Sequence, residues 1–339
     1  MRTMNKQTTQ RTETDRPAFH IRDLAIDGQL VLAPMSGYND RPFRRICRQF
    51  GASLVYTGLI SVNAVVYGEE RLGNRRTREM LRFHPEEHPV ACQLYGDDAA
   101  FIAAAAEEVA ALPVDVIDLN MGCAKRKITR NGAGVVLMAD PAKVRRIFAA
   151  LSAAVDLPVT GKIRLGVDET DYREKRYLDV ARAMVEGGAS LVAVHGRTGE
   201  QDFKGEVDYG AIAEIRAHVG VPVLVSGDVQ NAGDIPRVLE ATGCEGVMSG
   251  REAVGHPWIF QRRDRTDVSW AERLPVIREH LAATLAFHGA HHGMRRFRKH
   301  LRGYLRHAGV PRRLRIEMMQ CDDPDRLMGL LEQATRHLT

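Results

Sequence analysis

Residues 118–134 read DLNMGCAKRKITRNGAG, and a mostly apolar run, Val114–Leu119, leads into them. This run predicts a short buried strand that ends at Asn120. Cys123 follows in a turn opened by Gly122, on a loop that carries four basic residues before a second glycine turn. A thiol at the carboxyl end of a strand, surrounded by positive charge, can be a reactive group. The alternative is that Cys123 is a small packing residue, since free cysteines are usually buried and inert.

Similar apolar runs recur along the chain, each followed by a turn and an amphipathic segment. Most of the runs are continuous rather than alternating, which is typical of strands buried on both faces of a parallel sheet. Eight strand–helix repeats predict an α/β fold, the (β/α)8 TIM barrel. An open doubly wound sheet is the alternative, although no Gly-x-Gly-x-x-Gly sequence follows the first strand. The predicted strands are Leu30–Pro34, Ser53–Thr57, Val90–Leu94, Val114–Leu119, Val159–Ile163, Leu191–His195, Val221–Val225 and Gly246–Met248.

The strand pattern ends near residue 260, and helical periodicity follows it. Earlier in the chain, Asp140 and Asp234 each stand shortly before a proline and are expected to cap helices. The late segments predict helices over 274–287, 294–307 and 324–337. We therefore expect a disordered N-terminal tail over 1–20, a barrel domain over 21–262 and a small helical domain over 263–339.

The composition is that of an ordinary globular protein, with 339 residues, 44% hydrophobic residues, 27% charged residues and a net charge of +5. The five cysteines are scattered, and neither they nor the histidines show zinc-site spacing, so we expect no structural metal. Reduced thiols and a first segment without the apolar core of a signal peptide fit a cytoplasmic protein. No apolar stretch is long enough to span a membrane, and we expect a monomer.

The active site of a TIM barrel lies at the carboxyl ends of its strands. Gln93, Asn120, Lys162 and His195 each stand at or near the end of a predicted strand. A glutamine, a lysine, a histidine and a thiol at one opening are more than turn formation requires. The loops 226–228 and 249–251 follow the last two strands, and their glycines would let backbone N–H groups approach a phosphate. These loops predict a phosphate-bearing cofactor, although ordinary strand–helix turns are the alternative.

Seven short motifs stand at these strand ends in a fixed order: LAPMSG (32–37), QLYG (93–96), DLNMGC (118–123), KIRLG (162–166), HGRT (195–198), SGDV (226–229) and MSGR (248–251). Together they make the chain resemble the tRNA-dihydrouridine synthase family, most closely its bacterial B-type subgroup. The resemblance covers residues 28–310 and implies an FMN enzyme with a barrel and a helical domain. Two positions depart from the family pattern, because Ala124 stands in place of a proline and Ser226 in place of an asparagine.

The resemblance implies roles for the matching positions. Cys123 would protonate carbon 5 of the target uracil, while Asn120 and Arg197 would contact the substrate. NADPH would be the reductant, and tRNA would be the partner. The residues that would hold FMN are Pro34, Met35, Ser36, Gln93, Lys162, His195, Ser226, Gly227, Asp228, Gly250 and Arg251.

A basic segment lies in the predicted helical domain, with nine arginines or lysines and no acidic residue between His291 and Ile316. Four of these cations have helical spacing and would line one face, where they could contact RNA phosphates: Arg295, Lys299, Arg302 and Arg306. The alternative is a merely solvated helix face.

These observations give one hypothesis and two rivals. The hypothesis is the reduction of uridine in tRNA, with a hydride from reduced FMN to carbon 6 and a proton from Cys123 to carbon 5. The first rival is a flavin barrel that reduces a small molecule, for example a free pyrimidine. The second is an RNA-binding protein that has lost its chemistry.

Overall fold

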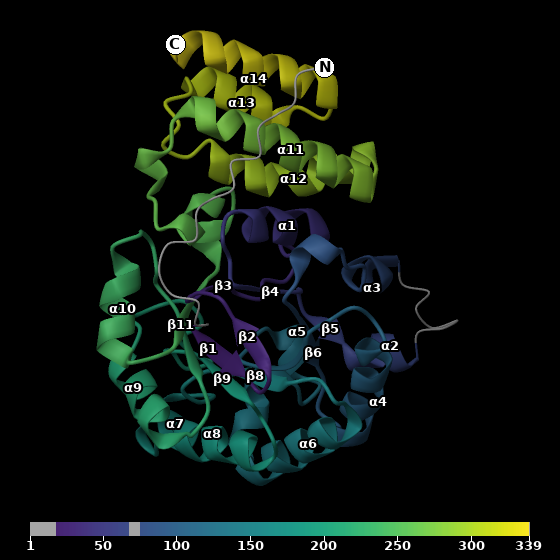
Figure 1. Cartoon of the computed structure of the whole chain (residues 1–339), viewed down its shortest axis with the longest axis vertical. Helices are drawn as coiled ribbons and strands as arrows, with labels where there is room; N and C mark the ends of the chain where they lie inside the picture. Colours follow the sequence, from purple (N-terminus) through teal and green to yellow (C-terminus); the bar gives the residue numbers. More distant parts are fainter. Residues whose placement is uncertain (1–17, 68–74, 339) are drawn as a thin grey trace.

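The structure is a computed structural model and describes residues 18–67 and 75–338. Within these residues, eight parallel strands form a closed barrel, because β4 pairs with β6 and joins the two ends of the sheet (Figure 1). The TIM barrel predicted from the sequence is therefore confirmed. The barrel strands are β3 (Leu30–Leu32), β4 (Leu54–Tyr56), β6 (Val90–Tyr95), β7 (Val116–Met121), β8 (Val159–Ile163), β9 (Leu191–His195), β10 (Val223–Ser226) and β11 (Gly246–Ser249).

Helices surround the strands and bury a large apolar layer between themselves and the barrel. The predicted cap at Asp140 is confirmed, since its carboxylate accepts a hydrogen bond from Lys143 N–H at 2.8 Å. The predicted cap at Asp234 is wrong: Gly233 is the N-cap, and Asp234 instead accepts from the N–H groups of the preceding turn. The helices are α1 (Arg41–Gln49), α2 (Val62–Val66), α3 (Arg75–Met80), α4 (Ala99–Ala110), α5 (Arg126–Thr129), α6 (Pro141–Ala154), α7 (Glu169–Arg173), α8 (Arg176–Glu186), α9 (Tyr209–His218) and α10 (Asp234–Thr242).

A β-hairpin closes the amino end of the barrel. Its strands, β1 (Phe19–Ile21) and β2 (Leu24–Ile26), pair antiparallel, and the hairpin lies across the barrel in Figure 1. Their apolar side chains pack with the first residues of several barrel strands, including Leu54, Val116 and Leu191. Of the predicted tail over 1–20, residues 1–17 lie outside the described part, and residues 19 and 20 belong to β1.

Four helices follow the barrel and form a separate lobe in Figure 1: α11 (Trp270–His288), α12 (Ala290–Tyr304), α13 (Arg312–Gln320) and α14 (Pro324–Leu338). Three were predicted, with starts or ends displaced by up to four residues, and α13 was not. These helices share a second apolar core that also includes Ile46 of α1 and Trp258. The boundary of the helical domain at residue 263 stays a prediction.

The lobe is attached to the barrel through buried contacts. Helix α1 packs on α11. The guanidinium of Arg265 bonds the Glu252 carboxylate at 2.5 Å and donates to the Gly303 carbonyl at 2.8 Å, which joins the end of the barrel to α12. Among the described helices, none combines the length and the apolar character needed to cross a membrane.

Candidate active site

A pocket of about 760 Å³ opens at the carboxyl ends of the barrel strands, a size typical of ligand-binding sites. The predicted residues that line it are Pro34, Met35, Ser36, Asn120, Cys123, Lys162, His195, Ser226, Gly227, Asp228, Gly250, Arg251 and Arg306. Predicted residues outside its lining are Gln93, Arg197, Arg295, Lys299 and Arg302. Thus most strand-end residues meet in one pocket, whereas most of the basic helix lies beyond it.

Cys123 is the cysteine that faces the pocket. Its side chain is partly exposed, whereas the other four cysteines are buried. Its backbone N–H donates to Asn120 Oδ1 at 3.0 Å, and its carbonyl accepts from Val135 N–H at 3.1 Å. Gly134 has a φ of +73°, and a Cβ there would lie 2.4 Å from the Cys123 carbonyl oxygen. The second glycine turn therefore supports the loop that presents the thiol.

A chain of buried hydrogen bonds runs from the barrel interior to this loop. Thr160 Oγ1 donates to Asp118 Oδ1 at 2.6 Å, and Gln93 Nε2 donates to Asp118 Oδ2 at 2.6 Å. Asn120 Nδ2 in turn donates to Gln93 Oε1 at 3.0 Å, which leaves Asn120 Oδ1 for the N–H of Cys123. The fully buried Gln93 thus orients Asn120, and through it the cysteine loop.

Two ionisable groups near this chain have displaced pKa values. Burial raises the pKa of Asp118 to about 6, against the opposing effect of the Thr160 and Gln93 hydrogen bonds and of Lys162. Burial also lowers the pKa of Lys162 to about 8, with a further decrease from Arg164 and an opposing increase from Asp118. The Lys162 ammonium, which lines the pocket, is therefore charged at neutral pH and loses its charge in mildly basic solution.

His195 is neutral in this site. Burial lowers its pKa to about 2, and the positive charges of Lys162, Arg164, Arg197 and Arg251 lower it further. Its Nε2 lies 3.3 Å from Nη1 of Arg197, which can only donate. The single ring proton therefore belongs on Nδ1, so that Nε2 accepts from the arginine.

The two glycine loops meet at Asp228, which has a φ of +46°. The buried Arg197 binds both oxygens of the Asp228 carboxylate and also donates to the Gly205 carbonyl at 2.7 Å. Arg251 approaches Asp228 Oδ1 at 3.6 Å and is 68% exposed. Arg197 and Arg251 therefore neutralise the Asp228 carboxylate at the loops where the sequence predicts a bound phosphate. The exposed Arg251 can also contact a ligand there.

Some pocket residues were not found from the sequence. Phe203 is 49% exposed and lines the pocket, and the guanidinium of Arg251 lies 4.9 Å from its ring centroid. Tyr38 also lines the pocket and has the Lys299 ammonium 4.5 Å from its ring centroid. Both stand in irregular loops, where the sequence offers no signal beyond an aromatic residue close to charged ones.

The predicted basic face lies beside this pocket. Arg295 and Arg302 are exposed on α12, and Lys299 is partly buried against Tyr38. Arg306 lies two residues beyond the end of α12 and lines the pocket itself, 3.9 Å from Glu252. A row of cations therefore extends from the outside of the lobe to the edge of the pocket.

The chain is similar to proteins of known class over most of its length. A family model described as Dihydrouridine synthase (Dus) matches residues 31–339. The chain is 37% identical over 319 residues to a probable tRNA-dihydrouridine synthase of Rhodobacter capsulatus, covering 92% of this chain and 96% of that protein. It is 36% identical over 310 residues to tRNA-dihydrouridine synthase B of Pseudomonas aeruginosa, covering 88% of this chain and 90% of that one.

Solved structures give a likeness of fold. Histamine dehydrogenase from Rhizobium sp. 4-9 superposes with a TM-score of 0.53 at 12% identity, covering 76% of this chain. A 2-naphthoyl-CoA reductase superposes with a TM-score of 0.55 at 10% identity, covering 74% of this chain. The chain spans about half the length of each, 49% and 52%, and at such low identity the likeness concerns the barrel fold alone.

Proposed function

Because the chain belongs to the dihydrouridine synthase family, we propose that it reduces uridine in tRNA to 5,6-dihydrouridine. The family predicted from the strand-end motifs is thereby confirmed. The observation that carries the proposal is the meeting of Cys123, Lys162 and Arg251 in one pocket. We further propose a monomeric, cytoplasmic enzyme that has tRNA as its partner.

The pocket residues fit a flavin mononucleotide. The glycine loops and the exposed Arg251 suit the phosphate, and apolar pocket residues such as Met35 suit a ring system. Gln93 lies outside the pocket lining and would act indirectly, through its hydrogen bond with Asn120. The residues proposed to hold FMN directly are Pro34, Met35, Ser36, Lys162, His195, Ser226, Gly227, Asp228, Gly250 and Arg251. The chemistry that FMN would supply is the delivery of a hydride to carbon 6 of uracil, after reduction by NADPH.

The chain's own residues would then complete the reduction. The C5=C6 double bond takes up a hydride at carbon 6 and a proton at carbon 5, and the thiol of Cys123, which lines the pocket, would donate that proton. Asn120 fixes the backbone of the cysteine loop and lines the same pocket, where it would contact the uracil. The charged Lys162 stabilises negative charge that develops nearby.

Arg197 would act on the site through another residue. It was expected to contact the substrate, but it is 2% exposed, and its guanidinium binds Asp228 and backbone carbonyls. We propose that Arg197 fixes Asp228 and His195 in place and that Arg251 and Arg306, which line the pocket as Lys162 does, are available to contact ligands.

The direct test is an assay on tRNA that lacks dihydrouridine, incubated with the purified protein, FMN and NADPH and mapped by mass spectrometry. Cys123→Ala should lower the rate of dihydrouridine formation by about 10²- to 10⁴-fold, the usual contribution of a positioned general acid. Cys244→Ala, at a buried cysteine outside the pocket, is the matched control. Full activity of Cys123→Ala, or no dihydrouridine with the unaltered protein, would contradict the proposal.

The RNA face can be tested separately from the chemistry. Charge reversal at Arg295 and Arg302 should raise the KM for tRNA and reduce the salt dependence of tRNA binding by roughly one counterion for each lost phosphate contact. Arg145→Glu, an exposed change on α6 at the barrel periphery, is the control and should leave both unchanged. If the reversed variant kept its KM, or if free uridine were reduced as fast as tRNA, the small-molecule alternative would be favoured.

A further inference from the structure

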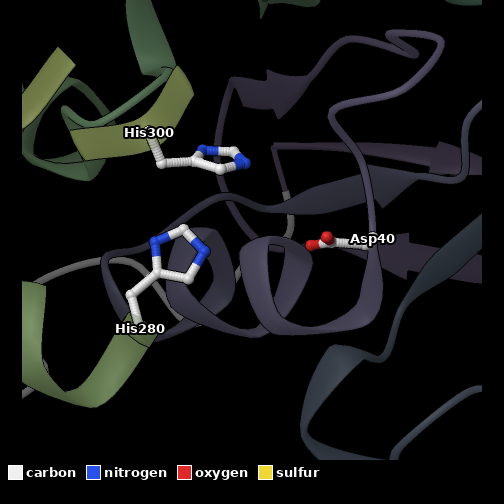
Figure 2. A group of neighbouring side chains, drawn as sticks. All are labelled: Asp40, His280 and His300. Carbon is white, nitrogen blue, oxygen red and sulfur yellow. The ribbon is translucent and has the colours of Figure 1, made fainter. Parts of the chain in front are cut away.

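Three potential metal ligands lie together where the barrel meets the C-terminal lobe. Asp40 directly precedes α1, His280 belongs to α11 and His300 belongs to α12. Figure 2 shows their side chains pointing toward one another across the junction. The histidines are 0% and 1% exposed, and the Asp40 side chain is 9% exposed. This group does not line the pocket proposed for uridine reduction.

Three of the four histidine ring nitrogens of this group lack, in the described part of the chain, the hydrogen-bond partners that buried polar atoms usually have. His280 Nδ1 lies 3.1 Å from the Tyr304 hydroxyl, but its Nε2 has no hydrogen-bond partner in the described part of the chain. The same holds for both ring nitrogens of His300. An imidazole nitrogen without a hydrogen-bond partner can offer its lone pair to a metal ion, and histidine is the commonest metal ligand in proteins.

We propose that Asp40, His280 and His300 bind a divalent transition-metal ion, for which Zn²⁺ is the best match. Two imidazoles and one carboxylate are a common three-ligand set for zinc. One ligand atom from each residue lies within 4.8 Å of the other two. Three atoms so spaced lie no more than about 2.8 Å from a common centre, so shifts of under about 1 Å would give zinc bond lengths of about 2.0–2.2 Å.

Neighbouring groups form hydrogen bonds with two of these ligands, His280 and Asp40. The Tyr304 hydroxyl can accept from His280 Nδ1–H, which leaves Nε2 for the ion. His288 Nε2 lies 3.0 Å from Asp40 Oδ2 and can donate to it, while Phe43 N–H donates to Oδ1 at 3.2 Å. Such outer hydrogen bonds to metal ligands are usual in metal sites.

A small cavity lies beside Asp40. It has a volume of about 20 Å³ and is lined by Asp40, Tyr38 and His288, among others, but not by His280 or His300. This volume can hold about one water molecule. The bound metal would join the start of α1 to α11 and α12, so its expected effect is to stabilise the junction.

The test uses the full-length protein and Zn²⁺ alone. The protein is loaded with Zn²⁺, freed from loose metal on a desalting column and analysed for metal content. The unaltered protein should retain about one Zn²⁺ per chain and show a higher Tm, whereas His280→Gln and His300→Gln should each lower retention to background. The matched control is His291→Gln with His292→Gln, an exposed pair on the same helix as His300 that should change nothing.

Two results would overturn the proposal: no retained Zn²⁺ on the unaltered protein, or retention that depends on the exposed His291 and His292 pair. A second measurement does not depend on the folding of variants. Crystals of the unaltered protein with Zn²⁺ should give an anomalous-scattering peak between Asp40, His280 and His300. A peak elsewhere, or none, would also refute the assignment.

Discussion

Replacement of Asp118 by asparagine tests the buried hydrogen-bond chain behind Cys123. The carboxylate accepts from both Thr160 and Gln93. An asparagine can keep both contacts, because its oxygen can still accept from Gln93 while its amide nitrogen donates to the Thr160 hydroxyl. The substitution therefore removes a buried negative charge and preserves the geometry of the chain.

The expected effect follows from the displaced pKa. Burial raises the pKa of Asp118 from 3.8 to about 6, so ionisation is less favourable in the folded protein by roughly two pKa units, or about 3 kcal/mol. A folded-state pKa above the unfolded one gives stability that is fully present below about pH 4 and is lost as the pH rises through about 6. Asparagine does not titrate and avoids this loss. Asp118→Asn should therefore gain up to about 3 kcal/mol over the unaltered protein between pH 4 and pH 7.

Urea unfolding at about pH 4.5 and about pH 7.5 measures this difference. The free energy of unfolding of Asp118→Asn relative to the unaltered protein should rise by about 2 kcal/mol between the two conditions. Asp156→Asn controls for the loss of a carboxylate at an exposed position. An equal difference between the two proteins at both pH values would refute the reasoning, because it would mean that Asp118 does not titrate between them.

Three further predictions concern other parts of the chain. Turnover should fall as the pH rises through about 8, where Lys162 loses its charge, and Lys162→Arg should move this fall to higher pH in a pH–rate profile. Arg44→Met should lower the free energy of unfolding, measured in urea, by about 3–5 kcal/mol, because it leaves the carboxylate of the buried Glu87, 2.6 Å from the guanidinium, without its partner. Arg45→Met should lower it by under about 1 kcal/mol, because its partner Glu86 is exposed to solvent. Gly134→Ala should lower both stability and turnover, whereas Gly289→Ala, with a similar positive φ and no atom within 4 Å of the new Cβ, should leave turnover intact.

The barrel was predictable because its strands are short continuous apolar runs with clear ends. The runs 159–163 and 191–195 match β8 and β9 to the residue. Strand β7 extends two residues further than predicted, to Met121, because Gln93 and Cys123 bind the polar side chain of Asn120 within the fold. Helix α13 was missed because it begins with a basic segment and buries only two side chains, too few for a recognisable apolar face.

The site was only partly predictable, for a similar reason. Residues at the end of a strand, such as Lys162, or directly after one, such as Gly250, reach the barrel opening because the fold brings strand ends there. Strand position alone did not show that Arg197 would be buried against Asp228. The group of Asp40, His280 and His300 combines distant parts of the chain, so no local spacing of ligands could reveal it.

The hairpin of β1 and β2 has a consequence for the order of events. It covers the amino end of the barrel, and the pocket in the described structure opens at the opposite end. We expect a bulky nucleotide reductant and a folded RNA to use that opening in turn. Initial rates measured against one substrate at several fixed concentrations of the other should therefore give parallel lines in a double-reciprocal plot, as for an enzyme that releases one product before it takes up the next reactant.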